Sequence, residues 1–235
     1  MDEKVQKVLD YIEEHKEEYL DALSAFCRPA SVAATGEGIE KMAGMVVDEL
    51  KKLGVEPTVL ETGGSPFIYG EIKGEVDRTF GFYDHYDVQP VDPIDEWITP
   101  PYSADIRDGV IYARGVADNK DGLVTRLCAV DAWQKVHGKL PLNVKFCFEG
   151  EEETGSPHLA SVAKAHPGDD SVRRLCVGGR PPRRGRPGRD YHGRERAFVC
   201  GAVRQGEREG RALDVRGHYA QPRLAPGAGA EHAAR

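Results

Sequence analysis

The sequence predicts an α/β fold in which helices cover a mixed, largely parallel sheet. Apolar residues at helical spacing fill residues 5–23 and 39–53, and a third helical pattern occupies residues 119–137. Short apolar runs that are typical of strands lie between these segments and after the last one. Because strands joined through a helix run parallel, this alternation favours a sheet with helices packed against it.

The individual elements follow in order along the chain. The second helical pattern ends at Gly54 and the third at Gly138, and glycine is a common residue just after a helix. Between residues 104 and 114, "RDG" turns "ADI" back into "VIYAR", which predicts a β-hairpin. Four further runs are predicted as strands: "PTVLET", "FIYGEI", "RTFGFYD" and "LNVKFCFEG".

The charge of the chain changes sharply near residue 170. Residues 1–170 hold 12 Lys and 5 Arg against 33 acidic residues, a net charge of -16, whereas residues 171–235 hold 15 Arg, no Lys and 6 acidic residues, a net charge of +9. Arg, Gly and Pro supply nearly half of this second segment, and no helical or strand period runs through it. We therefore expect residues 1–168 to fold and residues 169–235 to form a poorly structured, disordered tail.

The composition argues against several classes of protein. No apolar run is long enough to span a bilayer, and the opening stretch "MDEKVQKVLDYIEEHKEEYL" is charged and helical, which predicts a cytoplasmic protein with no membrane partner. The five cysteines are odd in number, widely spaced and contain no C-x-x-C pair. This pattern argues against a disulfide framework and against a thiolate zinc site.

Three polar clusters follow or adjoin predicted strands. "DHYD" follows "TFGFY", "RGVADNKDG" lies between a hairpin strand and a helix, and "EGEEETGS" follows "VKFCF". Ligands of α/β folds bind beyond the carboxyl ends of strands, so the clusters are candidates for one shared site. A histidine with several carboxylates and no cysteine suits a divalent metal that activates water.

Each cluster also has a simpler interpretation. His85 and Asp87, which alternation places on one face of a strand, can form a local hydrogen-bonded pair. Residues 151–153 are acidic, as solvated loops often are, and Asp118-Asn119 can cap a helix. The spacing of about 33 to 35 residues between clusters, the length of one β-α-β unit, favours a shared site, but residue types alone leave both interpretations open.

The order of these motifs adds a family resemblance. "HYDVQP", "YARGVADNK" and "EGEEETGS" resemble the three successive metal-site motifs of the zinc metallopeptidase family that includes carnosinase-type dipeptidases, carboxypeptidase G, acetylornithine deacetylase and succinyl-diaminopimelate desuccinylase. "VDPIDEWITPPYSADIRDGVIYARG" resembles the dipeptidase branch, so the similarity covers about residues 8–165. The resemblance implies the N-terminal part of a co-catalytic zinc-peptidase catalytic domain, which is truncated.

The resemblance implies a role for five residues. His85 matches a ligand of one metal, Asp118 the carboxylate that bridges two metals, and Glu153 a ligand of the other metal. Glu152 matches the general base and Asp87 the carboxylate behind the histidine. A bridging carboxylate holds two cations together, and a carboxylate behind a ligand histidine fixes its tautomer. The implied cofactors are two divalent cations: zinc, or alternatively manganese or cobalt.

Two residues depart from the family pattern. Asp84 stands where the family has a small residue and Asp121 where it has glycine, so each adds negative charge near the expected metals. The added charge tightens cation binding in one interpretation. In the other, Asp121 is a favourable carboxylate in the first turn of a helix. We favour the second interpretation for Asp121.

The segment after residue 170 shows no match to the rest of the family, which has further ligands and an inserted dimerisation domain with its own histidine. An RNA-binding extension, a disordered solubilising tail and translation in the wrong frame are three interpretations. "RDYHGRERAFVCGAV" can be encoded so that the shifted frame reads VITMGVKGLLYVEL, a family-like strand pair, and "RALDVRGHYAQPRLAPGAGAEHAAR" admits a family-like segment in the same frame. We therefore predict a frameshift between about residues 165 and 174 and no nucleic-acid partner.

The predicted function is hydrolysis of peptide or amide bonds by a two-metal-activated water, in a dipeptidase whose substrate is a small peptide or acyl amino acid. Full-length relatives are expected to be homodimers. An N-acyl amino acid deacylase is the alternative enzyme, and a non-catalytic metal-binding fragment and an Arg-rich RNA binder are the rivals from other classes. Because only three ligands are matched, we expect the 235-residue chain to be inactive or nearly so.

Overall fold

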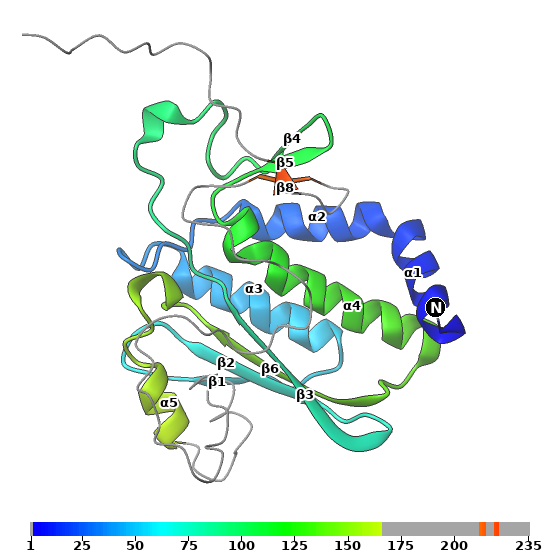
Figure 1. Cartoon of the computed structure of the whole chain (residues 1–235). Helices are drawn as coiled ribbons and strands as arrows, with labels where there is room; N and C mark the ends of the chain where they lie inside the picture. The colour runs from blue at the N-terminus through cyan, green and yellow to red at the C-terminus, as the bar shows by residue number, and fades with distance from the viewer. Residues whose placement is uncertain (1, 166–211, 215–218, 221–235) are drawn as a thin grey trace, which may run out of the picture.

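The structure, a computed structural model, describes residues 2–165, 212–214 and 219–220 of the chain (Figure 1). This part consists of helices and a mixed sheet, as the sequence predicts. None of the helices in these ranges is both long enough and apolar enough to cross a bilayer. The predictions made for residues 169–235, including their lack of structure, lie almost wholly outside the described residues.

The first helical stretch is two helices rather than one. Helix α1 spans Glu3–Glu14 and α2 spans Lys16–Cys27, and the chain bends at His15, where φ is -109° and ψ is 16°. The His15 ring stacks on Tyr11 with the ring centroids 3.9 Å apart. Both helices pack against the same later helix, α4, so the apolar spacing continues through the bend and does not reveal it.

The main sheet has the strand order β1-β2-β6-β3. The first two strands pair antiparallel, as do β2 and β6, whereas β3 and β6 pair parallel. The mixed sheet is confirmed, but parallel pairs do not predominate among the described strands. A short loop joins β1 to β2 and allows only antiparallel pairing, whereas a helix between β3 and β6 supplies the crossover that a parallel pair needs. The strands are β1 Thr58–Leu60, β2 Phe67–Ile72, β3 Val76–His85 and β6 Leu142–Glu149.

Helices α3, Ile39–Lys52, and α4, Asp121–His137, cover one face of this sheet (Figure 1). Alternation along β6 divides its side chains between the two faces. Phe146 is fully buried in the large apolar core with α3 and α4, whereas Cys147 packs in a smaller apolar cluster with α5, Leu159–Ala165, on the other face. The predicted third helix is thus confirmed as α4.

The predicted hairpin is also confirmed, as β4, Asp105–Arg107, paired antiparallel with β5, Val110–Tyr112. Two short strands from the C-terminal region extend it into a second sheet: β7, Ala212–Asp214, pairs with β5, and β8, Tyr219–Ala220, pairs with β7. These two strands are the only part of the predicted tail that the structure describes.

Candidate metal centre

Three side chains that the sequence singles out meet at one edge of the main sheet. His85, Asp118 and Glu153 each place one potential ligand atom within 4.8 Å of the other two. Strand β3 ends at His85 beside Glu149 of β6, and the carboxyl ends of these parallel strands share the edge. Glu153 follows closely in the 3-10 helix η3, Glu152–Thr154.

Asp118 reaches this edge from a different direction. It lies in η2, Val116–Lys120, the turn that leads into α4. The strand before this turn, β5, belongs to the second sheet. His85 and Glu153 therefore follow strands of the main sheet, whereas Asp118 follows a strand of the second sheet.

The backbone at Asp118 is not helical. Its φ and ψ are -148° and 89°, and its peptide bond to Asn119 is cis. Helix α4 begins at Asp121 without a side-chain cap, so Asp118-Asn119 is not the helix cap that the sequence allows. Instead the Asp118 Oδ1 atom lies 3.1 Å from His85 Nε2. The Asp118 side chain remains 73% exposed, which leaves one side of the cluster open to solvent.

His85 is buried, with one ring nitrogen toward the protein and one toward the cluster. Its Nδ1 lies 3.3 Å from an Asp87 carboxylate oxygen and 3.2 Å from the Asp87 carbonyl oxygen. Its Nε2 faces Asp118 and lies 3.8 Å from Glu152 Oε2. A proton held on Nδ1 by Asp87 leaves the Nε2 lone pair free to bind a cation.

Asp87 also fixes the backbone that carries Glu152 and Glu153. This carboxylate is fully buried and accepts hydrogen bonds from the backbone N-H groups of Glu152, at 3.2 Å, and Glu153, at 3.0 Å. One side chain thus orients the histidine and holds the turn after β6. Gln89 adds a contact that the sequence did not single out, because its Nε2 donates to the Glu153 carboxylate at 3.0 Å.

The electrostatics reflect carboxylates gathered around one histidine. Burial lowers the pKa of His85, but its contacts with Asp118 and Asp87 outweigh burial and raise this pKa well above its usual value. Burial raises the pKa of Glu153 above its usual range, although the hydrogen bond from Gln89 opposes the shift. The cluster therefore attracts positive charge at the point where the ligand atoms converge.

The donor set fits a divalent cation. One imidazole nitrogen and two carboxylate oxygens are ligands that zinc, manganese and cobalt all accept. A buried carboxylate stands behind the histidine, which is the usual support of a ligand imidazole. His85, Asp118 and Glu153 are the residues that would hold the metal, and among residues 2–165 no other group of three or more such ligands lies at metal-binding distance.

Asp84 lies close to the candidate ligands, as expected, but its charge is paired. It is fully buried one residue before His85, and alternation turns it to the other face of β3. There it forms an ion pair with Arg126 of α4. Its charge is therefore balanced by a guanidinium. Arg126 was not singled out from the sequence, since nothing in its local pattern identifies its partner.

Asp121 lies in the first turn of α4, as expected. Its carboxylate accepts a hydrogen bond of 2.6 Å from the Gly122 N-H. Burial nevertheless raises the pKa of Asp121 to about 6, and the nearby charge of Asp118 adds to the increase. The favourable helix position is therefore partly offset by the cost of burying the charge.

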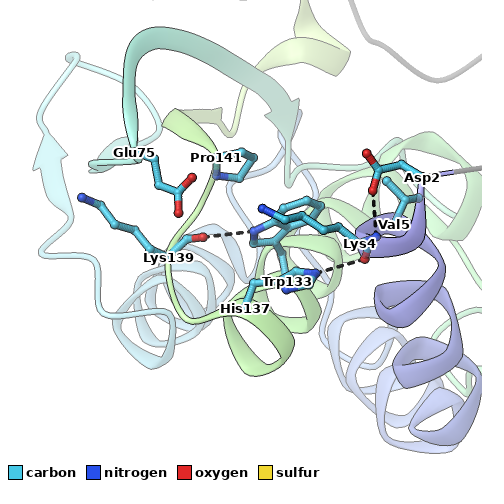
Figure 2. A pocket seen from close by; sticks show the side chains of 8 residues that line it. All are labelled: Asp2, Lys4, Val5, Glu75, Trp133, His137, Lys139 and Pro141. Atoms are coloured by element: carbon cyan, nitrogen blue, oxygen red, sulfur yellow. Dashed lines mark hydrogen bonds between the residues drawn. The ribbon is translucent and has the colours of Figure 1, made fainter.

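A cavity of about 290 Å³ lies elsewhere in the fold (Figure 2). Trp133 and His137, near the C-terminal end of α4, form part of its wall, together with residues of α1. Asp118 precedes the opposite end of this helix, which spans roughly 25 Å. The cavity is thus separate from the candidate metal centre. Its lining is completed by Asp2, Lys4, Val5, Glu75, Lys139 and Pro141.

A helix-covered mixed sheet with a histidine and carboxylates at one edge has the architecture and the ligand types of a metal-binding α/β domain. The model of the peptidase family M20/M25/M40 matches residues 81–213, and the chain belongs to this family. This confirms the resemblance derived from the three motifs, and the match extends past residue 170, into the segment that was expected to show none. The family is metal-dependent.

Individual relatives agree with this assignment. The human Beta-Ala-His dipeptidase is 33% identical over 177 residues, which cover 68% of this chain and 35% of the relative. The crystal structure of human carnosine dipeptidase 1 matches with a TM-score of 0.65 and 30% identity over 70% of this chain and 38% of that one. An M20 family metallo-carboxypeptidase from Sulfolobus solfataricus matches with a TM-score of 0.62 and 42% identity over 64% and 35%. The chain thus spans about a third of the length of these relatives.

Proposed function

We propose that this chain carries part of the active site of a metal-dependent peptide hydrolase of the dipeptidase type. The observation that supports this best is the convergence of His85, Asp118 and Glu153 in front of the buried Asp87. Relatives named as dipeptidases, among them a Cys-Gly metallodipeptidase of Candida albicans at 32% identity over 171 residues, support the reaction class.

The site residues divide into ligands and supports. His85 and Glu153 would each hold a different divalent cation, and Asp118 would be the carboxylate that is a ligand of both. Zinc is the proposed metal, with manganese or cobalt as alternatives. When bound, two such cations lower the pKa of a shared water and polarise a scissile carbonyl. Asp87 keeps the histidine proton on Nδ1 and holds the turn that carries Glu153.

Glu152 is the proposed general base. Its side chain is 40% exposed and its Oε2 lies near His85 Nε2, so it is accessible to solvent beside the ligand atoms. A carboxylate at this place takes a proton from the attacking water and returns it to the leaving amine. The backbone N-H of Glu152 donates to the Asp87 carboxylate, which fixes the start of the turn.

The proposed substrate is a small unblocked peptide. An acyl amino acid is the second candidate, because a succinyl-diaminopimelate desuccinylase of Dechloromonas aromatica is 29% identical over 138 residues. Rates of hydrolysis measured with a dipeptide and with an N-succinyl amino acid of the same C-terminal residue separate the two classes of substrate. Cytoplasmic location and homodimers of the full-length protein complete the proposal.

Cation titration of the purified chain tests the site itself. We expect Zn²⁺ to bind the parent chain and binding to be lost in His85→Ala, whereas His137→Ala, at the far end of α4, keeps the parent affinity. Dipeptide hydrolysis tests the reaction, in a version of the protein that is restored to the shifted frame and extended to the family length. Hydrolysis there should be sensitive to a chelator and abolished by Glu152→Gln. Zn²⁺ affinity that is unchanged in His85→Ala would contradict the proposal.

We also propose that residues 169–235 arise from translation out of frame. The support is the change from a charge of -16 in residues 1–170 to +9 in the remainder, together with the family-like peptides that the shifted frame permits. The nucleotide sequence across codons 160 to 175 tests this proposal, because a single inserted or deleted base is expected there. An uninterrupted frame in independent reads would overturn it.

A further inference from the structure

Two residues that flank the candidate ligands are joined to each other. Asp84 directly precedes His85 on β3, and Asn119 directly follows Asp118 in η2. The Asn119 Nδ2 group donates a hydrogen bond of 3.0 Å to Asp84 Oδ1. The two segments that supply the histidine and the proposed bridging carboxylate, which lie far apart in sequence, are therefore tied together directly beside the ligands.

The surroundings of this contact hold it in one arrangement. Asp84 is fully buried and forms an ion pair with Arg126, whose side chain is only 16% exposed. The Arg126 guanidinium also lies 6.0 Å from the centre of the Phe82 ring. A Cβ atom placed on Gly122 would lie 2.2 Å from Asn119 Oδ1, so the asparagine amide fills the space that this glycine leaves.

We infer that Asp84, held by Arg126, is a positioning residue that fixes Asn119 and thereby sets Asp118 opposite His85. The inference rests on the proposed metal-binding function of this site. Asp118 sits in a turn with non-helical φ and ψ, and its side chain is largely exposed, so the turn needs support from outside. The hydrogen bond from Lys120 N-H to the Gly115 carbonyl closes the turn, and the Asn119 amide attaches it to β3.

A double-mutant cycle on Zn²⁺ affinity tests the inference. The 235-residue chain, Asp84→Ala, Asn119→Ala and the double variant are each titrated with Zn²⁺ against a chromophoric chelator. Because Asp84 and Asn119 act through one hydrogen bond, each single variant should weaken Zn²⁺ binding about tenfold and the double variant by about the same factor. Asn119→Ala leaves the ion pair intact and carries the test if Asp84→Ala does not fold.

Two further variants separate positioning from general destabilisation. Asp84→Asn retains a side-chain oxygen that can accept the hydrogen bond from Asn119, although it removes the charge partner of Arg126. Unlike Asp84→Ala, it should therefore keep Zn²⁺ affinity within twofold of the parent chain. Asp131→Ala removes another α4 contact, the hydrogen bond from the Tyr19 hydroxyl, and should leave Zn²⁺ affinity unchanged. The inference, but not the proposed function, would be overturned by single variants that bind Zn²⁺ as tightly as the parent chain. It would also be overturned if the two losses of Zn²⁺ affinity multiplied in the double variant. A parent chain that binds no Zn²⁺ would overturn the proposed function as well.

Discussion

Two buried carboxylates lie beside the candidate metal centre, and each has a cation near it. Asp84 pairs with Arg126, and Asp87 interacts electrostatically with Lys120. Lys120 is itself fully buried, and its Nζ donates to the Pro29 carbonyl oxygen at 3.1 Å. Burying an ionised group is costly unless it is paired, so these cations allow acidic residues to be packed below the site and not only at its surface.

Burial of Lys120 has a cost that its partners only partly offset. It lowers the pKa of this ammonium to about 8, while Cys27 and Asp87 act in the opposite direction. A buried lysine is retained here next to the turn that carries Asp118.

Asp121→Asn should stabilise the metal-free chain in a pH-dependent way. Asp121 has a pKa of about 6 in the folded chain against 3.8 as its ordinary value, so the folded state binds the proton more tightly. Its ionised form therefore costs stability above pH 6, and this cost disappears as the pH falls below about 4. We expect the free energy of unfolding to rise by about 1–3 kcal/mol at pH 8 and by roughly half as much at pH 5.

Urea unfolding in the presence of a chelator measures this effect. Asp10→Asn is the matched control, because Asp10 is exposed on α1 and its replacement should change the free energy of unfolding by less than about 0.5 kcal/mol at either pH. If Asp121→Asn raised the free energy of unfolding equally at pH 8 and pH 5, burial of the charge would not be the cause of the stabilisation.

The sequence predicts the residues that meet at the site better than it predicts their supports. Strand alternation places His85 and Asp87 on one face, and the structure has their side chains in contact. The same alternation places Asp84 on the opposite face, but it cannot identify Arg126, which lies on a helix that is distant in sequence. A tertiary partner of this kind depends on how α4 packs on β3, which local patterns do not encode.

At the scale of elements, helices and strands are predicted but their spatial order is not. The third helix and the hairpin occur where the periodicity places them. The insertion of β6 between β2 and β3 has no local signal, because strand order depends on contacts between segments that are distant in sequence. The bend at His15 is missed for a related reason, since both helices that it separates pack against α4.

Gly115→Ala tests how the turn before Asp118 is built. Gly115 has φ of +78°, and a Cβ there would lie 2.2 Å from Cγ1 of the fully buried Val88. Gly36 has φ of +75°, but no atom lies within 4 Å of its would-be Cβ. Both alanine variants carry the cost of a left-handed residue, about 1–2 kcal/mol. Only Gly115→Ala adds a steric clash. We therefore expect it to lower the free energy of unfolding, measured in urea, by about 1–3 kcal/mol more than Gly36→Ala does. An equal decrease in the free energy of unfolding in both variants would contradict the close contact with Val88.

At the scale of the whole molecule, one edge of the sheet collects elements from most of the described chain. Strands β3 and β6 reach it with their carboxyl ends, and α4 reaches it with its N-terminus (Figure 1). Carboxylates therefore gather where a helix N-terminus also favours negative charge. A cation bound between these side chains would reduce the remaining repulsion among Asp118, Glu152 and Glu153.

The 235-residue chain should bind divalent cations weakly and show no turnover. The described residues offer three ligands, so two cations that share Asp118 have two protein ligands each, whereas a catalytic zinc normally has three and a water. We therefore expect one equivalent of Zn²⁺ to bind before any second, and dipeptide hydrolysis to stay at the uncatalysed rate with added Zn²⁺ or Mn²⁺. Native mass spectrometry counts the cations, and an amine-release assay follows hydrolysis. Chelator-sensitive hydrolysis by this chain that is lost in Glu152→Gln would show that further ligands come from outside the described residues.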